Sequence, residues 1–189
     1  MQAQNSSLID FALQGLQRCW MPEHGRWSHI YHLDGREHPN ESIPHSDVFY
    51  TLNVLVGLSR AARIPSSIDV GETFRRNAAR LNKLPVRKYA YGTALWAAAE
   101  LGLELPADVL ADMERLLSTQ DAWKLFHAQD IGMILIGAVA QARHDPKKWS
   151  PAARALFEFL IENYHSESGL FFDTAQGMRR RFSSFATQT

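Results

Sequence analysis

The side chains best suited to chemistry gather in one polar stretch, residues 23–47. It begins at Glu23, ends at Asp47 and holds five histidines between them. Carboxylate and imidazole groups are common proton donors and acceptors in enzymes. Aromatic and polar side chains lie in and around the stretch; the candidates for substrate binding are Trp20, Trp27, Tyr31, Arg36, His45, Tyr50 and Asn53. Because a binding pocket for a sugar combines aromatic rings with polar groups for the hydroxyls, the stretch predicts a sugar or glycan ligand, with Glu23 or Asp47 as acid or base.

The histidines also suggest a metal site, because His29 and His32 have the spacing of a ligand pair. Zinc needs two further ligands, which commonly come from a cysteine pair or from a His-Glu-x-x-His helix. Neither pattern occurs in the sequence. We therefore favour a solvated polar loop, and we predict no metal and no other cofactor.

Part of this chemistry is repeated near the other end of the chain. Residues 20–27 are echoed by residues 164–171 with aromatic, glutamate, glycine and aromatic at the same offsets. The matching positions are Trp20 and Tyr164, Glu23 and Glu167, Gly25 and Gly169, Trp27 and Phe171, and, further on, Arg36 and Arg180. Glu167 is then a further candidate acid or base, and Arg180 a further binding residue.

A structural interpretation of the repeat is also open. The glycine supplies a positive φ, the aromatic residue closes the end of a helical hairpin, and the glutamate caps backbone amides. The repetition favours this interpretation, because a catalytic residue need occur only once.

A second candidate acid–base pair is His127 with Asp130. The two residues lie three apart at the expected start of a helix, so they share one helical face. They predict either a His–Asp pair at the rim of a cavity or a helix cap, with Asp130 stabilised in the first turn by the helix dipole. The cap is the favoured interpretation.

The spacing of apolar residues predicts seven helices and no evident strand. The expected ranges are about 7–20, 47–62, 70–84, 89–101, 107–117, 128–142 and a last helix from residue 151. The first, third, fifth and seventh have one apolar stripe, whereas the second, fourth and sixth are apolar on nearly every side. An outer layer with one wet face and a covered inner layer would produce this alternation. Glycines on the inner helices, namely Gly57, Gly92, Gly132 and Gly137, would allow backbones to approach closely.

The sequence therefore predicts an all-α fold of repeated α-hairpins in two layers. This pattern resembles the α/α toroids, which include six-hairpin glycosidases, sugar 2-epimerases, terpenoid cyclases and prenyltransferases. The resemblance covers the whole chain but is architectural, because no family motif is matched residue by residue. It implies a carbohydrate-active or carbohydrate-binding protein, with hydrolysis or epimerisation as the reaction class.

The toroid expected from residues 1–189 is a single incomplete domain. Three hairpins and the outer helix of a fourth are present, and residues 184–189 align with residues 46–51 at the start of an inner helix. We expect either a fragment of a longer protein, which we favour, or an open edge that meets another chain.

Composition limits the other function classes. Lys and Arg number 20, as do Asp and Glu, so no net charge attracts nucleic acid or an anionic membrane. The single cysteine, Cys19, fits a reducing compartment, and no signal peptide or membrane span is evident, which predicts a cytoplasmic protein. Two alternatives stay open: a non-catalytic helical scaffold that binds a partner, and a terpenoid cyclase or prenyltransferase, although aspartate-rich clusters are missing.

Overall fold

A computed structural model describes residues 2–61, 68–173 and 181–182. The described chain is mostly helical, which confirms the predicted all-α class. The helices are α1 (Gln2–Cys19), α2 (Pro44–Ser59), α3 (Val70–Ala78), α4 (Tyr89–Leu101), α5 (Ala107–Ser118), α6 (Gln120–Trp123), α7 (Ala128–Ala142) and α8 (Pro146–Glu162). The strands are β1 (Trp20–Met21), β2 (Arg26–Trp27), β3 (Ile30–Tyr31), β4 (Asn40–Glu41), β5 (Tyr164–His165), β6 (Leu170–Asp173) and β7 (Arg181–Phe182).

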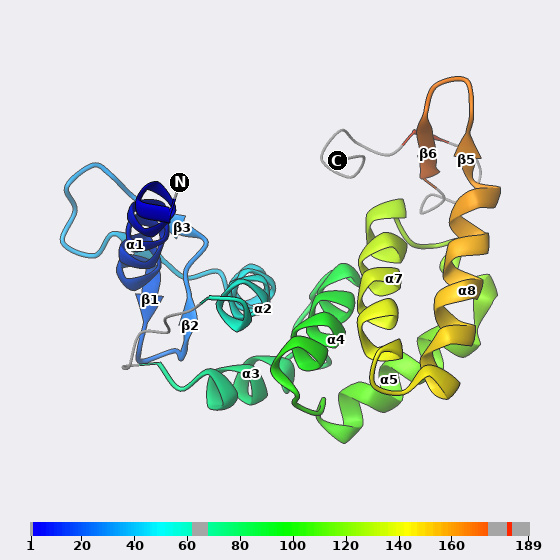
Figure 1. Ribbon diagram of the computed structural model, residues 1–189, viewed down its shortest axis with the longest axis horizontal. Helices are drawn as coiled ribbons and strands as arrows, with labels where there is room; N and C mark the ends of the chain where they lie inside the picture. Colours follow the sequence, from blue (N-terminus) through cyan, green and yellow to red (C-terminus); the bar gives the residue numbers. More distant parts are fainter. Residues whose placement is uncertain (1, 62–67, 174–180, 183–189) are drawn as a thin grey trace.

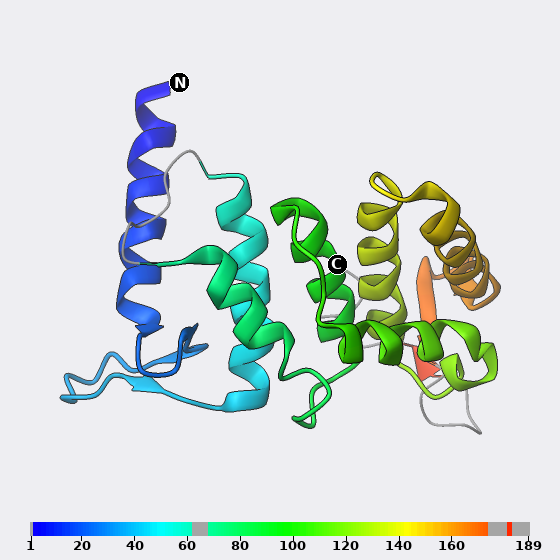
Figure 2. The same ribbon diagram turned by 90° about the horizontal axis from the view of Figure 1, so that it is seen from below.

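Three helices, α2, α4 and α7, lie side by side in the middle of the molecule, and we call them the inner helices. Figure 1 shows them along an arc, with α1, α3, α5 and α8 outside it. Burial is greatest on α4, where nine residues are buried, whereas α5 buries only Val109 and Met113. α7 is less covered than its apolar sequence predicts, because Ile136 and Val139 are exposed. Figure 2 shows the axes of α1 and α2 nearly parallel, with the polar loop at one end of both helices.

Two glycines bring α4 and α7 into backbone contact. A Cβ atom added at Gly92 would overlap the backbone of Met133 and Ile134, and one at Gly137 would overlap the carbonyl oxygen of Gly92. The prediction of close approach is thus confirmed at Gly92 and Gly137. It is wrong at Gly57 and Gly132, where an added Cβ would have no atom within 4 Å.

The sequence repeat corresponds to a repeated β-hairpin. β1 pairs with β2 so that Trp20 faces Trp27, and β5 pairs with β6 so that Tyr164 faces Phe171. Gly25 and Gly169 both have positive φ, at 61° and 70°. The predicted glycine conformation is therefore confirmed, but the expectation of no strand is wrong. Strands of two to four residues are too short to show a periodicity that a sequence pattern can reveal.

The carboxyl-terminal ends of the inner helices meet at Glu100. Its Oε1 accepts hydrogen bonds from Arg60 Nη2 at 2.9 Å, Arg143 Nη2 at 2.5 Å and Trp96 Nε1 at 3.1 Å. Arg60 is the C-cap of α2 and Arg143 is the C-cap of α7, so the carboxylate on α4 joins all three helices. The hydrogen bonds from Arg60 and Arg143 lower the pKa of Glu100 to about 2.

We expect Glu100→Gln to lower the free energy of unfolding by about 1–2 kcal/mol at pH 7, less than the pKa shift alone implies, because both arginines are more than half exposed to solvent. The folded pKa lies below the unfolded value of 4.5, so the stabilisation is complete above pH 4.5 and is lost as the pH falls toward 2. Urea unfolding of both proteins between pH 7 and pH 2 measures it. A difference that does not shrink in acid would contradict this account.

Candidate functional site

The polar loop is folded against the first hairpin and the start of α2. After β2 the chain forms the β3–β4 hairpin, in which Ile30 faces Glu41 and Tyr31 faces Asn40. The Asn40 side chain ties this hairpin to α1, because its Nδ2 donates to the carbonyl oxygen of Arg18 at 2.8 Å. The loop is therefore held at both sides, and its polar side chains have defined positions.

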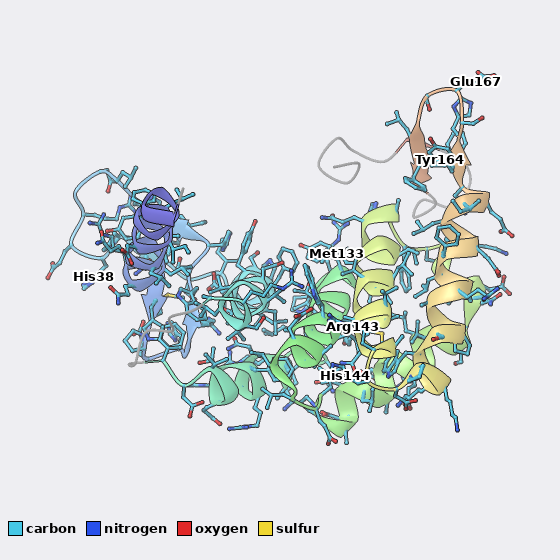
Figure 3. All side chains as sticks on the ribbon, viewed as in Figure 1. His38, Met133, Arg143, His144, Tyr164 and Glu167 are labelled. Carbon is cyan, nitrogen blue, oxygen red and sulfur yellow. The ribbon has the colours of Figure 1, made fainter. Side chains whose placement is uncertain are left out.

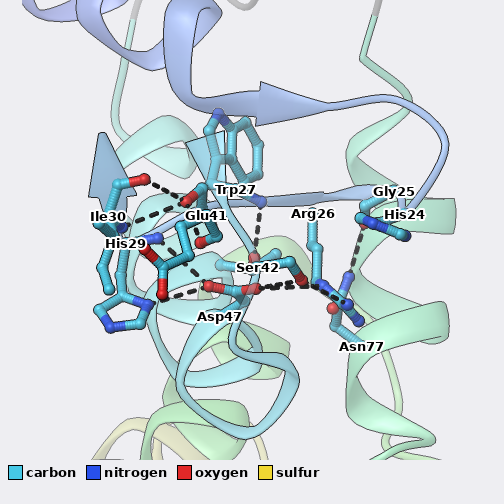
Figure 4. Close-up of polar contacts among 12 residues, drawn as sticks. His24, Gly25, Arg26, Trp27, His29, Ile30, Glu41, Ser42, Asp47 and Asn77 are labelled. Carbon is cyan, nitrogen blue, oxygen red and sulfur yellow. Dashed lines mark hydrogen bonds and ion pairs between the residues drawn. The ribbon is translucent and has the colours of Figure 1, made fainter. Parts of the chain in front are cut away.

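Asp47, on the first turns of α2, is the centre of a buried polar network (Figure 4). Its Oδ1 accepts from the backbone nitrogen of His29 at 3.3 Å and lies 3.0 Å from His29 Nδ1. Its Oδ2 accepts from Ser42 Oγ at 2.9 Å and lies 3.5 Å from Arg26 Nε. The carboxylate is fully buried. Asp47 is thus surrounded by its own partners, and no part of it is open to a ligand.

Arg26 is the buried cation that faces Asp47. Arg26 is 3% exposed, and its Nη2 donates a hydrogen bond to Ser42 Oγ at 3.1 Å. Burial lowers the pKa of Arg26, and the nearby charges of Arg80 and Arg76 lower it further. Nε and Nη1 have no hydrogen-bond partner within the described residues. Asp47 is therefore the main compensation for a guanidinium that would be costly to bury alone.

The second copy of the hairpin has Leu170 where the first has Arg26. The hairpin therefore forms without a charge at this position. The buried ion pair is a property of the first copy only, which marks this part of the molecule as the candidate site.

His29 and Tyr50 lie on the other side of Asp47. Their rings stack in parallel, with centroids 5.0 Å apart and an interplanar angle of 3°. His29 is half-buried and Tyr50 is exposed, so part of this stacked pair is accessible to solvent.

A pocket of about 280 Å³ lies beside this network, between the turn of the β1–β2 hairpin and the β3–β4 hairpin. Its lining residues are Trp20, Met21, Glu23, His24, His38, Pro39, Asn40 and Ser42. Ser42 connects the pocket wall to the buried pair, because its hydroxyl bonds both Arg26 and Asp47. Glu23 is exposed, with Oε1 3.7 Å from His24 Nε2. Carboxylate, imidazole, amide, hydroxyl and indole groups thus share one small pocket.

The pair His127 and Asp130 has the geometry of a helix cap. Asp130 Oδ2 accepts from the backbone nitrogen of His127 at 3.0 Å, which is half of a capping box at the start of α7. Its Oδ1 accepts from the backbone nitrogen of Tyr89 at 2.9 Å, at the start of α4. The buried Asp130 thus belongs to the cap of α7, as the favoured interpretation predicts. It also caps α4, which the sequence did not predict.

The other predicted residues are dispersed. Trp27 is 1% exposed, and its Nε1 donates to the carbonyl oxygen of Leu16, so its ring belongs to the core. Arg36 is ion-paired with Asp34 at 2.5 Å on the surface, and Asn53 Nδ2 donates to the Phe49 carbonyl within α2. Tyr31 is half-buried in β3, and His45 is exposed near the start of α2. Arg180 lies outside the described residues.

Glu167 lies far from the pocket. Figure 3 shows Glu167 at the tip of the β5–β6 hairpin, at the opposite end of the arc from His38. Within the described chain no backbone amide is seen to donate to Glu23 or Glu167, so the capping role suggested for the repeated glutamate has no support.

Sequence reasoning did not single out Arg26, Ser42, Asn40 or the pairing of His24 with Glu23. The contrast between Arg26 and Leu170 within the repeat was the one available signal. Across the described ranges, no group of three or more His, Cys, Asp or Glu side chains has the arrangement to hold a metal ion.

No family model, curated protein or solved structure matches this chain. Among the helices described, none combines the length and the apolar character needed to cross a membrane.

Proposed function

We propose that this chain is part of an α/α toroid and binds carbohydrate in the pocket beside the Arg26–Asp47 pair. The pocket carries the proposal, because it joins the indole of Trp20 to Glu23, Asn40 and Ser42 within about 280 Å³. A small pocket with one aromatic wall and several hydrogen-bonding groups suits a monosaccharide unit, which presents an apolar face and a ring of hydroxyls.

The arrangement of the helices supports the toroid. The predominantly apolar helices α2, α4 and α7 lie along the arc, and α1, α3, α5 and α8 lie outside it (Figure 1). The polar loop precedes α2, at the end where the inner helices α4 and α7 also begin near Asp130. Toroid enzymes of the kind that the sequence resembles are expected to build their sites at such an end.

The reaction class proposed with this site is acid–base chemistry on a sugar, hydrolysis or epimerisation. Glu23 is the proposed acid or base, because its carboxylate is exposed and lines the pocket beside His24. Asp47 is instead proposed to fix the pocket wall through Ser42, since both of its oxygens are already engaged. A sugar is favoured over an isoprenoid, because polar groups occupy much of the pocket wall.

A second candidate function is a helical scaffold that binds a protein partner. The observation that favours it is an exposed apolar face on α8, formed in part by Phe157 and Ile161. This candidate function does not exclude the first, because the apolar face lies on α8 whereas the pocket lies between the β1–β2 and β3–β4 hairpins.

We expect Trp20→Ala to weaken sugar binding about tenfold or more, because it removes the only indole in the pocket lining. Tyr164→Ala is the matched control: Tyr164 has the same place in the second hairpin, where its ring packs on Phe171 at 5.2 Å as Trp20 packs on Trp27 at 4.6 Å. Titration calorimetry against a panel of neutral mono- and disaccharides measures both variants.

Equal weakening by the two substitutions would assign the loss to hairpin stability rather than to the pocket. If no member of the panel binds the unsubstituted protein, the carbohydrate proposal fails.

A further inference from the structure

A second pocket, of about 330 Å³, lies where the last turns of α5 and the short helix α6 meet the start of α4. We call it the α4–α5 pocket. It shares no lining residue with the pocket beside the Arg26–Asp47 pair. Tyr91, Leu116 and Phe126 give it an apolar wall with two aromatic rings. It is therefore a different kind of site from the polar pocket that we assign to a sugar.

Hydrogen bonds to the backbone hold the apolar wall in place. Tyr91 is 4% exposed, and its hydroxyl donates to the carbonyl oxygen of Leu81 at 3.1 Å, so its ring has one fixed position. Trp123 Nε1 donates to the carbonyl oxygen of Leu116 at 2.8 Å, which fastens α6 to α5. Because the wall is formed before a ligand arrives, binding need not order it, and the entropic cost of binding is lower.

One edge of the α4–α5 pocket is charged. Lys88, Asp112 and Arg115 line it, and Asp112 accepts a hydrogen bond from Arg115 Nη2, so these two charges compensate each other. Lys88 is half-buried, and within the described residues it forms no ion pair; its Nζ lies 4.9 Å from the centroid of the Tyr91 ring. Two cations and one carboxylate leave this edge with one positive charge beside an apolar wall.

We propose that the α4–α5 pocket binds a small aromatic carboxylate. The aromatic body packs against Tyr91, Leu116 and Phe126, and the carboxylate pairs with Lys88 Nζ at the charged edge. The volume is at the lower end of the range for small-molecule sites, which suits a ligand of one or two rings. Burial of the rings supplies the driving force, and the ion pair supplies the selectivity for an anion.

The test uses naphthalene-2-carboxylate as the probe and naphthalene-2-carboxamide as its neutral counterpart of the same shape, each titrated into the whole chain by calorimetry. We expect the carboxylate to bind about tenfold more tightly than the amide, and Lys88→Met to remove this difference without weakening the amide. Arg87→Met is the matched control. Arg87 is the neighbouring cation and also lies over a tyrosine ring, that of Tyr89 at 5.7 Å, but it does not line the pocket.

A variant that fills the pocket locates the binding. Ala122 also lines the α4–α5 pocket, so Ala122→Phe places a ring in the space of the ligand and should abolish binding of both probes. Circular dichroism melting checks that each variant is folded; if Lys88→Met is not, Lys88→Gln replaces it, and if Ala122→Phe is not, Ala122→Leu replaces it. The proposal is overturned if the carboxylate does not bind, if the amide binds as tightly, if binding survives filling of the pocket, or if Arg87→Met has the effect expected of Lys88→Met.

Discussion

Replacing Gly92 with alanine is expected to lower the free energy of unfolding by about 3 kcal/mol or more. The added Cβ would lie closer than 3.0 Å to backbone atoms of Met133 and Ile134 on α7, and backbone cannot move aside as a flexible side chain can. α4 and α7 would have to separate and would lose the packing between their buried faces. The better helix propensity of alanine, about 1 kcal/mol, does not offset this loss. Urea unfolding followed by circular dichroism measures the change.

Gly132 and Gly57 provide the control for this experiment. Both lie inside helices, and an added Cβ at either position would meet no atom within 4 Å. Alanine at these positions is therefore expected to leave stability unchanged or to raise it by about 0.5–1 kcal/mol. Similar losses at Gly92 and Gly132 would show that the close approach of α4 and α7 is not the cause.

Asp47→Asn is expected to cost about 3 kcal/mol of stability. The substitution keeps the shape of the side chain but removes its charge, so Arg26 remains buried without a counter-charge while Arg76 and Arg80 still repel it. The pocket should also lose its defined wall, because Ser42 bonds both members of the pair. Urea unfolding at pH 7 gives the first effect, and sugar titration gives the second.

The internal repeat suggests a second substitution, Arg26→Leu, that should offset the loss of stability from Asp47→Asn. Leu170 occupies the position of Arg26 in the second hairpin, so Arg26→Leu combined with Asp47→Asn should recover at least about 1 kcal/mol of the loss from Asp47→Asn alone. Asp34→Asn, in the exposed pair with Arg36, is expected to leave the stability unchanged, because solvent screens that pair. An additive double-mutant cycle would falsify the assignment of the cost to an unpaired Arg26.

The inner helices were the most predictable part of the fold. α4 and α7 occupy the ranges expected from their long apolar patterns, Tyr89–Leu101 and Ala128–Ala142. The ends of helices that depend on capping residues or turns were less predictable. α8 begins at Pro146 rather than at residue 151, because Asp145 caps it by accepting from the backbone nitrogen of Lys148. α3 ends at Ala78 rather than near residue 84, since the segment that follows forms turns.

The candidate site was predictable only in part. Residue types alone placed Glu23, Asp47 and Trp20 in the important region, and the structure puts Glu23 and Trp20 in one pocket. The burial of Asp47 and its pairing with Arg26 depend on how the loop folds back onto α2, and no local pattern encodes that. Trp27 illustrates the same limit, because an aromatic residue in a polar loop suits a ligand platform and a core wedge equally well.

The carboxylate of Asp130 has a consequence for local opening of the molecule. It accepts hydrogen bonds from the first amide of α4 and from the amide of His127, the N-cap of α7, and these helices begin far apart in the sequence. Because Asp130 belongs to α7, fraying at the start of α7 also removes the hydrogen bond to Tyr89, so we expect the start of α4 to exchange its amide protons with solvent whenever the start of α7 opens.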